Sequence, residues 1–360
     1  GLPQGAKQLL YNHGKILGRT ASARHFVDDP KEDPEALAGN LREDIYKGHD
    51  QKFLKATVLV GLDPSFTVKA HIMMPEDQAF NLLSYILNFH FFDEEAEKIY
   101  KKSKLYDEGD IYFYFDPNTQ DEDYPKGFGV FDAPHNCAAV FGLRYFGEMY
   151  DGKYDITVLH DDAFIISRED GSSVALEPSY FDKTHDYPAG HHETKYYTTI
   201  MNCAVTQDED GKKVIVTEDL RNNNGRVIKT RYTSPHRVDY ENAPITALFW
   251  IMKDGSLPPI LKVDDPVLAT TMGLTLATKR TSAENLPKGF DMNTLVIEPF
   301  ADPFRAYPVS GDYSDFKELF TKRGASCYIL NTDAFMGKDI PKEVTKKLVE
   351  DLANDTIKDS

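Results

Sequence analysis

The chain has few cysteines, a single tryptophan and no long apolar run. Its three cysteines, Cys137, Cys203 and Cys327, are scattered over 360 residues and form no Cys-x-x-Cys pair. This pattern does not indicate a disulfide framework and fits a reducing compartment, so we expect a cytoplasmic protein. The longest apolar stretches, such as residues 245–252, are far shorter than the roughly 20 residues that span a bilayer.

Basic residues are also scarce, since 41 Lys and Arg face 58 Asp and Glu, for a formal net charge of −17. A surface this negative repels phosphate backbones and anionic lipid head groups, so we expect neither nucleic-acid nor membrane binding. A small anionic ligand remains compatible with this charge, because a pocket can be locally basic inside an acidic protein.

Apolar side chains are plentiful enough for a large core. Hydrophobic residues make up 41% of the chain and aromatic residues 12%, and there is no long low-complexity run, so we do not expect wholesale disorder. A length of 360 residues favours two lobes. The predicted elements change near residues 154–160, after which strands paired as hairpins begin. We therefore predict an N-terminal lobe over residues 1–156 and a C-terminal lobe over residues 157–360.

Hydrophobic periodicity predicts a mixture of strands and helices, a mixed α/β (α+β) fold. We expect strands at residues 55–61, 68–73, 111–115, 163–167, 173–176, 213–217, 227–232, 247–252 and 326–330. We expect helices at residues 76–89, 264–279, 312–323 and 341–352. Turn residues predict that 163–167 pairs with 173–176 as a hairpin, and 213–217 with 227–232 as another.

Four segments in the first two thirds of the chain carry motifs in a recognisable order. They are residues 15–28 (KILGRTASARHFVD), 145–152 (YFGEMYDG), 160–184 (HDDAFIISREDGSSVALEPSYFDKT) and 229–232 (KTRY). Four more follow: residues 247–261 (ALFWIMKDGSLPPIL), 272–284 (MGLTLATKRTSAE), 299–316 (PFADPFRAYPVSGDYSDF) and 328–332 (YILNT). Together they resemble the ATP-dependent phosphoenolpyruvate carboxykinases over most of the chain.

The resemblance implies a two-lobed phosphoenolpyruvate carboxykinase-like fold. It also implies a lyase reaction of gluconeogenesis, in which oxaloacetate and ATP give phosphoenolpyruvate, CO₂ and ADP with the help of a divalent metal. By the same resemblance, Arg19, Tyr145 and Arg231 stand where the family binds substrate. A guanidinium suits bidentate binding of a carboxylate or phosphate, and the alternative for each residue is a structural salt bridge or hydrogen bond.

The segment that relatives use for nucleotide binding is missing. Relatives follow the GEM segment with a strand, a metal-binding histidine and a G-x-x-x-x-G-K-[ST] loop, whereas here Tyr154 is followed by His160 only six positions later. Such a loop supplies backbone N–H groups, a lysine and a hydroxyl for phosphates and Mg²⁺. Residues 147–154 (GEMYDGKY) mimic it formally, but Glu148 and Asp151 would repel phosphate. We expect a reduced nucleotide-binding lobe that does not bind ATP.

The family's metal site is altered as well. By resemblance, Asp151 replaces a lysine ligand, and Asp162 keeps the aspartate ligand with Asp161 beside it. Three carboxylates could hold Mg²⁺, Mn²⁺ or Ca²⁺, and the alternative is a set of solvated loop acids. Ala163 and Phe164 stand where the family has Glu and His, and neither can ligate a metal or move a proton.

Other candidates are weaker. Glu177 keeps a family glutamate, and Lys183 and Thr184 keep a Lys-Thr pair that also suits a strand end. His191-His192-Glu193 reads better as a polar loop than as a metal site, because it lacks HExxH and a partner at ligand spacing. A cysteine nucleophile at Cys137 or Cys203 has no supporting motif.

The sequence thus leaves several functions open, and it identifies no catalytic residue. The first is a catalytically degenerate carboxykinase-like protein, a pseudoenzyme that retains at most small-anion or metal binding. The alternatives are an active carboxykinase, a repurposed metal-dependent enzyme, and a structural subunit. As partners we expect a small carboxylate or phosphate, and a second copy of this chain or a complete family member.

Overall fold

The computed structural model describes much of the chain. The described residues are 8–11, 24–26, 31, 33–46, 52–116, 126–131, 154, 157–160, 163–184, 187, 191–201, 203–216, 225–230, 236–280, 289–301 and 309–354. Within them the protein has a mixed α/β fold, as predicted, and this fold contains several small sheets. No helix in these ranges is long and apolar enough to cross a membrane.

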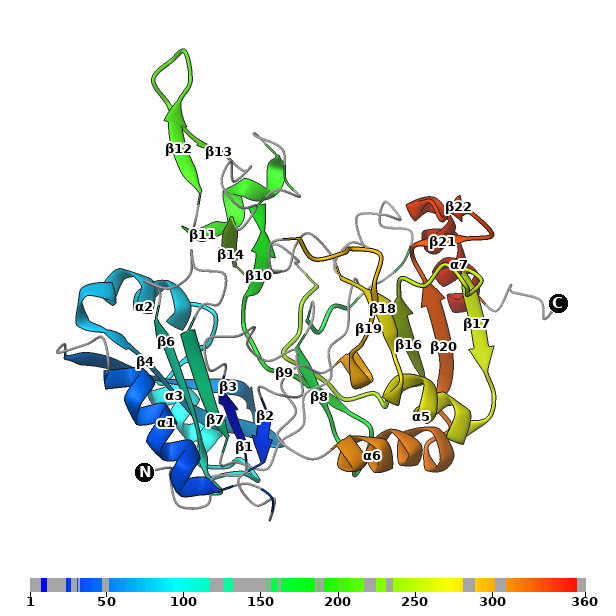
Figure 1. The fold of residues 1–360 in the computed structure, drawn as a ribbon, viewed down its shortest axis with the longest axis horizontal. Helices are drawn as coiled ribbons and strands as arrows, with labels where there is room; N and C mark the ends of the chain where they lie inside the picture. Colours follow the sequence, from blue (N-terminus) through cyan, green and yellow to red (C-terminus); the bar gives the residue numbers. More distant parts are fainter. Residues whose placement is uncertain are drawn as a thin grey trace.

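The largest sheet is formed by the N-terminal part of the chain (Figure 1). Its seven strands lie in the order β2-β1-β7-β6-β4-β3-β5, and all neighbours are antiparallel except β4 and β6. The strands are β1 (Gln8–Tyr11), β2 (Arg24–Phe26), β3 (Phe53–Asp63), β4 (Phe66–Pro75), β5 (His90–Phe91), β6 (Asp110–Asp116) and β7 (Lys126–Phe131). The accompanying helices are α1 (Pro34–Tyr46), the short 3₁₀ helix η2 (Glu76–Gln78), α2 (Ala79–Ile86) and α3 (Glu94–Tyr100).

The alternation of side chains along β3 and β4 sets which helix covers which face of this sheet. Val58 and Val60 pack with Leu82 of α2, whereas Leu59, which points to the other face, packs with Ala96 and Tyr100 of α3. The carboxylate of Asp93 caps α3 by accepting a hydrogen bond from the Ala96 N–H at 2.9 Å.

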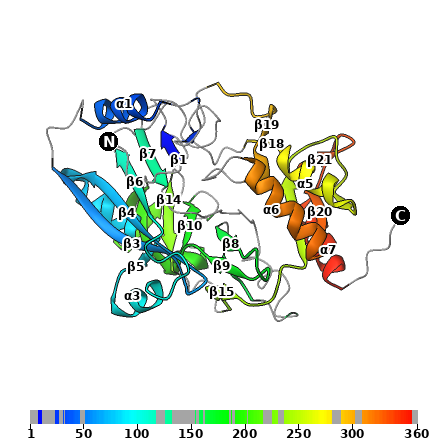
Figure 2. The same ribbon diagram turned by 90° about the horizontal axis from the view of Figure 1, so that it is seen from below.

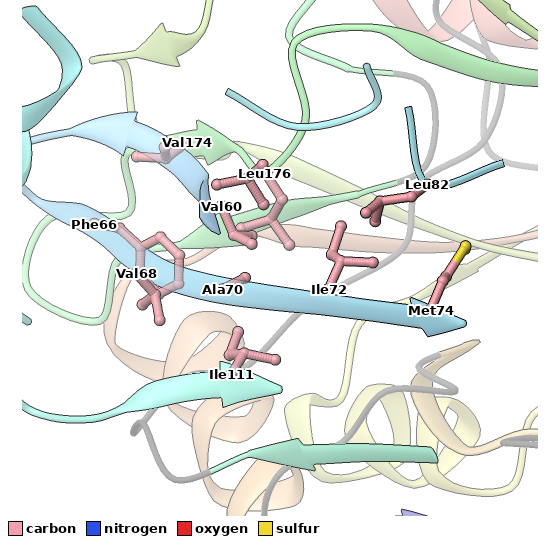
Figure 3. Packing of buried hydrophobic residues seen from close by; sticks show 11 residues of the cluster. Val60, Phe66, Val68, Ala70, Ile72, Met74, Leu82, Ile111, Val174 and Leu176 are labelled. Atoms are coloured by element: carbon pink, nitrogen blue, oxygen red, sulfur yellow. The ribbon is translucent and has the colours of Figure 1, made fainter. Parts of the chain in front are cut away.

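The first hydrophobic core gathers on the α2 face of the sheet (Figure 3). It includes Val68, Ala70 and Ile72 of β4, all fully buried, and it also takes in Val174 and Leu176 from much later in the chain. The first core therefore contains side chains from both sides of residue 157, and the lobe boundary after residue 156 stays a prediction.

Three small sheets follow in the middle of the chain. The first joins β8 (Phe164–Ile166), β9 (Ser173–Ala175) and β15 (Tyr240–Glu241). The second joins β10 (Tyr180–Lys183), β14 (Arg226–Lys229) and β11 (Tyr197–Met201), which is preceded by the 3₁₀ helix η5 (His192–Tyr196). The third is the isolated hairpin of β12 (Ala204–Gln207) and β13 (Lys213–Val216).

The C-terminal part builds a second core. Here β16 (Ala247–Met252) runs parallel to β20 (Ser326–Asn331), and β17 (Ile260–Val263) pairs antiparallel on the other side of β20. The remaining elements are α5 (Pro266–Leu274), β18 (Ala277–Lys279), β19 (Leu295–Ile297), η7 (Pro299–Ala301), α6 (Val309–Lys322), β21 (Ala334–Phe335), β22 (Lys338–Asp339) and α7 (Lys342–Ala353). Figures 1 and 2 both place β8 and β9 between this part and the large sheet.

Two sequence-based predictions of local structure are wrong. Residues 213–216 pair with β12, and residues 226–229 pair with β10 and β11, so the predicted hairpin between these two segments does not form. Residues 213–216 pair with β12, the strand nearer in sequence, because the loop between the two strands is much shorter. A hydrogen bond from the Asp208 N–H to the Lys212 carbonyl, at 2.9 Å, closes this loop. The helix predicted over residues 264–279 ends at Leu274, and Ala277–Lys279 form β18 instead.

The predicted hairpin of β8 and β9 is confirmed. Its turn contains Asp170, whose carboxyl group has a lowered pKa. The hydroxyl and backbone N–H of Ser172 both donate to Asp170 Oδ1, at 2.6 and 3.0 Å, and lower the pKa of this carboxyl to about 2. Asp170 therefore stabilises the turn above its unfolded pKa of 3.8, and this contribution is lost as the pH falls through about 2.

Replacing Ser172 with alanine removes the hydroxyl donor and leaves the backbone donor in place. We expect the pKa of Asp170 to rise toward its ordinary value, and the acid unfolding of the variant to begin at higher pH. A carboxyl-carbon NMR titration of both proteins measures the shift directly. An unchanged Asp170 titration in Ser172→Ala would show that the hydroxyl has no such effect.

Candidate functional site

The predicted site residues lie outside the part of the chain that the structure describes. This applies to Arg19, Tyr145 and Arg231 and to Asp151, Asp161 and Asp162. Their described sequence neighbours His160 and Lys229 are both buried. They belong to two groups of polar contacts, one at each end of strand β10, which together we refer to as the network around β10.

Strand β10 lies at an edge of its small sheet and pairs with β14, the middle strand. Tyr180 at its start pairs with Lys229 at the end of β14, and Lys183 at its end pairs with Arg226. Val227 and Ile228 of β14 are fully buried, which fits a strand covered on both faces. The polar side chains of β10 and β14 are thereby drawn into the interior, where they need partners.

Lys229 is the centre of the first half of the network. Its side chain is fully buried, and its ammonium lies 2.7 Å from Asp182 Oδ2 and 2.5 Å from Glu193 Oε2. The ammonium also donates to the Tyr187 hydroxyl at 2.8 Å, and that hydroxyl donates to Asp182 Oδ2 at 2.5 Å. The three N–H donors of the lysine thus meet three acceptors, so its hydrogen-bonding capacity is used within the protein.

The loop before β11 is tied to the sheet by this lysine. Tyr187 lies with its ring 4.4 Å from the Lys229 ammonium, and its edge meets His191 with the ring centroids 5.2 Å apart. The His191 side chain caps η5 by accepting from the Glu193 N–H. Glu193 is 2% exposed, so the interpretation of His191–Glu193 as a plain polar loop is wrong for Glu193, whose partner is an ammonium group.

His160 and Glu177 form the second half of the network. The Ala163 N–H donates to His160 Nδ1 at 3.0 Å, and Nε2 lies 3.0 Å from the carbonyl oxygen of Ser179. A ring nitrogen that accepts from a backbone N–H carries no proton, so His160 is the neutral tautomer with its proton on Nε2. Glu177 Oε2 lies 3.7 Å from Nε2, and Asn88 donates to Glu177 Oε1 at 2.5 Å.

Arg237 closes the network on the other side of Tyr180. One guanidinium nitrogen bonds Asp239 at 3.0 Å, a second donates to the Glu177 carbonyl oxygen, and the guanidinium lies 5.6 Å from the Tyr180 ring. Tyr180 also stacks on His160, with the ring planes inclined by only 17°. The fully buried Tyr180 ring therefore contacts both a cation and an imidazole.

The network satisfies charge internally. Lys229 and Arg237 are each matched by carboxylates, so neither offers an unneutralised cation to an incoming anion. Within the described ranges no group of three or more His, Cys, Asp or Glu side chains is arranged to hold a metal ion. The chemical effect of these contacts is to fix the positions of β10, β14, η5 and the segment after His160 relative to one another.

Sequence reasoning missed most of these residues. It noted Glu177 by resemblance, but it gave no role to His160, Asp182, Tyr187, Lys229 or Arg237. A lysine directly after the apolar run Val227-Ile228 is the one local signal that was available, because a charged residue at that position needs a buried counter-charge. The counter-charges themselves come from 36 and 47 positions away along the chain (229 − 193 and 229 − 182), and no pattern in the sequence connects them.

No family model matches the chain, and no curated protein matches it either.

Proposed function

We propose that this chain is a phosphoenolpyruvate carboxykinase-like protein that does not transfer a phosphoryl group and that binds a small carboxylate or phosphate anion. The observation that carries the proposal is the six-position step from Tyr154 to His160, which replaces the nucleotide-binding loop of the family. Without backbone N–H groups and a lysine to surround the β- and γ-phosphates, the charge that develops during phosphoryl transfer has no stabilising partner.

Residues near the short spacing between Tyr154 and His160 also support the loss of phosphoryl transfer. Phe164, at the position of a family histidine, is 6% exposed and lies in β8, where it cannot exchange protons. Lys229, which opens the motif of Arg231, is neutralised by Asp182 and Glu193. A phosphate would have to compete with both carboxylates for this ammonium, and it would be repelled by them.

The positive charge for an anion therefore has to come from the arginines of the resemblance, Arg19 and Arg231, with Tyr145 as a hydroxyl donor. Arginine suits this role, because its guanidinium remains charged and binds carboxylate or phosphate through two parallel hydrogen bonds. Bound metal at Asp151, Asp161 and Asp162 would be an addition to this function and is not needed for anion binding.

Two measurements on the full chain test the proposal. We expect calorimetry to detect no binding of ATP with Mg²⁺, and a coupled assay for phosphoenolpyruvate formation from oxaloacetate to stay flat. We expect oxaloacetate or phosphoenolpyruvate to raise the melting temperature, because a ligand that binds only the folded state stabilises it. Tight ATP binding or measurable product formation would overturn the loss of phosphoryl transfer.

Variants of Arg19 and Arg231 test where the anion binds. Arg19→Met and Arg231→Met are each expected to abolish the ligand-induced rise in melting temperature, whereas Arg168→Met is the matched control. Arg168 is largely exposed and pairs with Asp315 of α6, and the resemblance gives it no part in substrate binding, although it lies in the motif segment 160–184. An equal ligand response in all three variants would rule out the proposed anion site.

A further inference from the structure

We infer that Thr57, His71 and Asp110 of the large sheet form a hydrolytic triad, in which the threonine hydroxyl takes the acyl group of a small carboxylic ester. This inference is independent of the proposed anion site. The Thr57 hydroxyl lies 3.0 Å from His71 Nδ1, and His71 Nε2 lies 2.8 Å from Asp110 Oδ2. A hydroxyl that contacts one nitrogen of an imidazole, with a carboxylate on the other nitrogen, is the arrangement that activates a hydroxyl as a nucleophile.

Three adjacent strands hold the triad in place. Thr57 on β3 and His71 on β4 are cross-strand partners, and Asp110 on β6 is the partner of Lys69, two positions before His71 on the same face of β4. The side chain of Thr57 is β-branched, which restricts rotation about its first side-chain bond. The three groups are thus positioned by the hydrogen-bonded sheet and not by a loop, which favours a precise geometry.

The hydrogen-bonding chemistry assigns a direction to the two contacts. An ionised carboxylate can only accept, so His71 Nε2 carries the proton that it donates to Asp110. In the neutral imidazole Nδ1 is then the acceptor, and the Thr57 hydroxyl donates to it. Two further contacts orient these groups. The Lys69 ammonium lies 3.4 Å from Asp110 Oδ1, and the Tyr112 ring lies 4.9 Å from the imidazole, centroid to centroid.

Burial shields the base and leaves the nucleophile within reach of solvent. Along this face of β3, Lys55 is exposed, Thr57 is half-buried and Leu59 is fully buried beneath α3. His71 is only 7% exposed. A substrate can therefore approach Thr57 from the side of Lys55. Lys55 stands about 7 Å from Thr57 along the strand, so its ammonium can approach the negative charge that develops on the ester oxygen.

The opposite face of the same strands shows how these positions look when packing alone decides. There the neighbouring residues Val58, Ala70, Ile72 and Ile111 are all apolar, and Figure 3 shows the last three in the first core. A buried imidazole, by contrast, is costly unless both ring nitrogens have partners. A hydroxyl and a carboxylate supply both partners here, and the resulting order of groups is the one that acyl transfer requires.

The reaction balances with water as the second substrate. Thr57 Oγ1 bonds to the carbonyl carbon of the ester while its proton passes to His71 Nδ1, and the alcohol then leaves with that proton. Water next attacks the acyl-threonine, gives a proton to Nδ1, and releases the acid as Thr57 Oγ1 regains the proton. Asp110 is a positioning residue, which stabilises the imidazolium and does not take its proton. One ester and one water give one acid and one alcohol.

The full chain with p-nitrophenyl acetate as the probe tests the inference. We expect release of p-nitrophenol and an acetyl group on Thr57, located by peptide mass spectrometry. Surface lysines also react with this probe, and hydroxylamine separates the two products, because it removes an acetyl ester from threonine and leaves an acetyl amide on lysine. A natural chain that carries no hydroxylamine-sensitive acetyl group on Thr57 would overturn the inference.

Variants of the triad separate catalysis from a purely structural contact. Thr57→Val keeps the shape and is expected to lose the acetyl ester, whereas Thr57→Ser keeps a hydroxyl and is expected to become acetylated. His71→Gln should slow acetylation by about a hundredfold or more. Asp110→Asn should lower kcat and leave KM unchanged. Thr206→Val is the matched control, because Thr206 is a strand threonine whose cross-strand partner is a valine. Circular dichroism confirms that each variant is folded. Unchanged acetylation of Thr57 in folded His71→Gln would show that the contacts are structural only.

Discussion

Replacing Lys229 with methionine is expected to lower the free energy of unfolding by about 3–5 kcal/mol, because it leaves buried carboxylates without their counter-charge. The lysine is fully buried, Glu193 is 3% exposed at its side chain and Asp182 16%, and both oxygens lie within 2.7 Å of the ammonium. Methionine has a similar volume, so the loss reports charge and hydrogen bonding rather than a cavity. Urea unfolding followed by circular dichroism measures the change.

Two further variants make the Lys229 measurement specific. In Lys322→Met the same substitution breaks an exposed pair with Glu318 on α6, at 2.7 Å, and it should change the free energy by less than about 1 kcal/mol. The triple variant Lys229→Met, Asp182→Asn, Glu193→Gln removes the buried charges together and is expected to recover much of the lost stability. If Lys229→Met and Lys322→Met have equal effects, the buried network contributes no more than a surface ion pair.

Replacing Trp250 with alanine is expected to cost about 3–5 kcal/mol, because its indole fills the centre of the second core. The ring lies 5.2 Å from Phe316 and 5.9 Å from Phe300, and its Nε1 donates to the Ala269 carbonyl at 3.1 Å. Gly273 faces the same ring so closely that a Cβ there would lie 2.5 Å from it. The indole is thus enclosed, and the surrounding side chains have little freedom to collapse into the space it would leave.

Phe249→Ala is the matched control for Trp250→Ala. Phe249 is the preceding residue of β16, half-buried on the opposite face, where its ring stacks on Tyr328. We expect it to cost about 1–2 kcal/mol, in proportion to its smaller buried area. Trp250 is the single tryptophan, so circular dichroism rather than fluorescence has to follow unfolding in its variant. A smaller loss for Trp250→Ala than for Phe249→Ala would mean that the second core is not centred on Trp250.

The strands that sequence patterns predicted well are those whose signal is local. The buried runs at residues 247–252 and 326–330 became β16 and β20, and residues 55–61 and 68–73 fall within β3 and β4. Alternation and β-branched residues are sufficient there, because the strand is determined by its own side chains. The predicted pairing of residues 213–217 with 227–232 failed, because pairing is a choice between partners that each have the same local pattern.

The candidate site shows the same contrast between what local sequence motifs predict and what contacts between distant residues decide. Motifs of the resemblance single out Arg19, Tyr145 and Arg231, which remain predictions, and they include Glu177, which does belong to the network around β10. The sequence patterns gave no role to His160, although it opens the motif segment 160–184, and none to Tyr187. Their importance arises from contacts with Ala163, Ser179 and Lys229, and it becomes visible only when those atoms have positions.

By itself, the sequence determined the mixed α/β character, the positions of the main buried strands, and the short spacing of six positions from Tyr154 to His160. These properties depend on composition and on neighbours along the chain. Only the tertiary structure decided that Lys229 is neutralised by Asp182 and Glu193, and that residues 213–216 pair with β12 rather than with residues 226–229. The physical reason is that a buried charge or a strand edge has meaning only through its partner, and that partner can come from any distance along the chain.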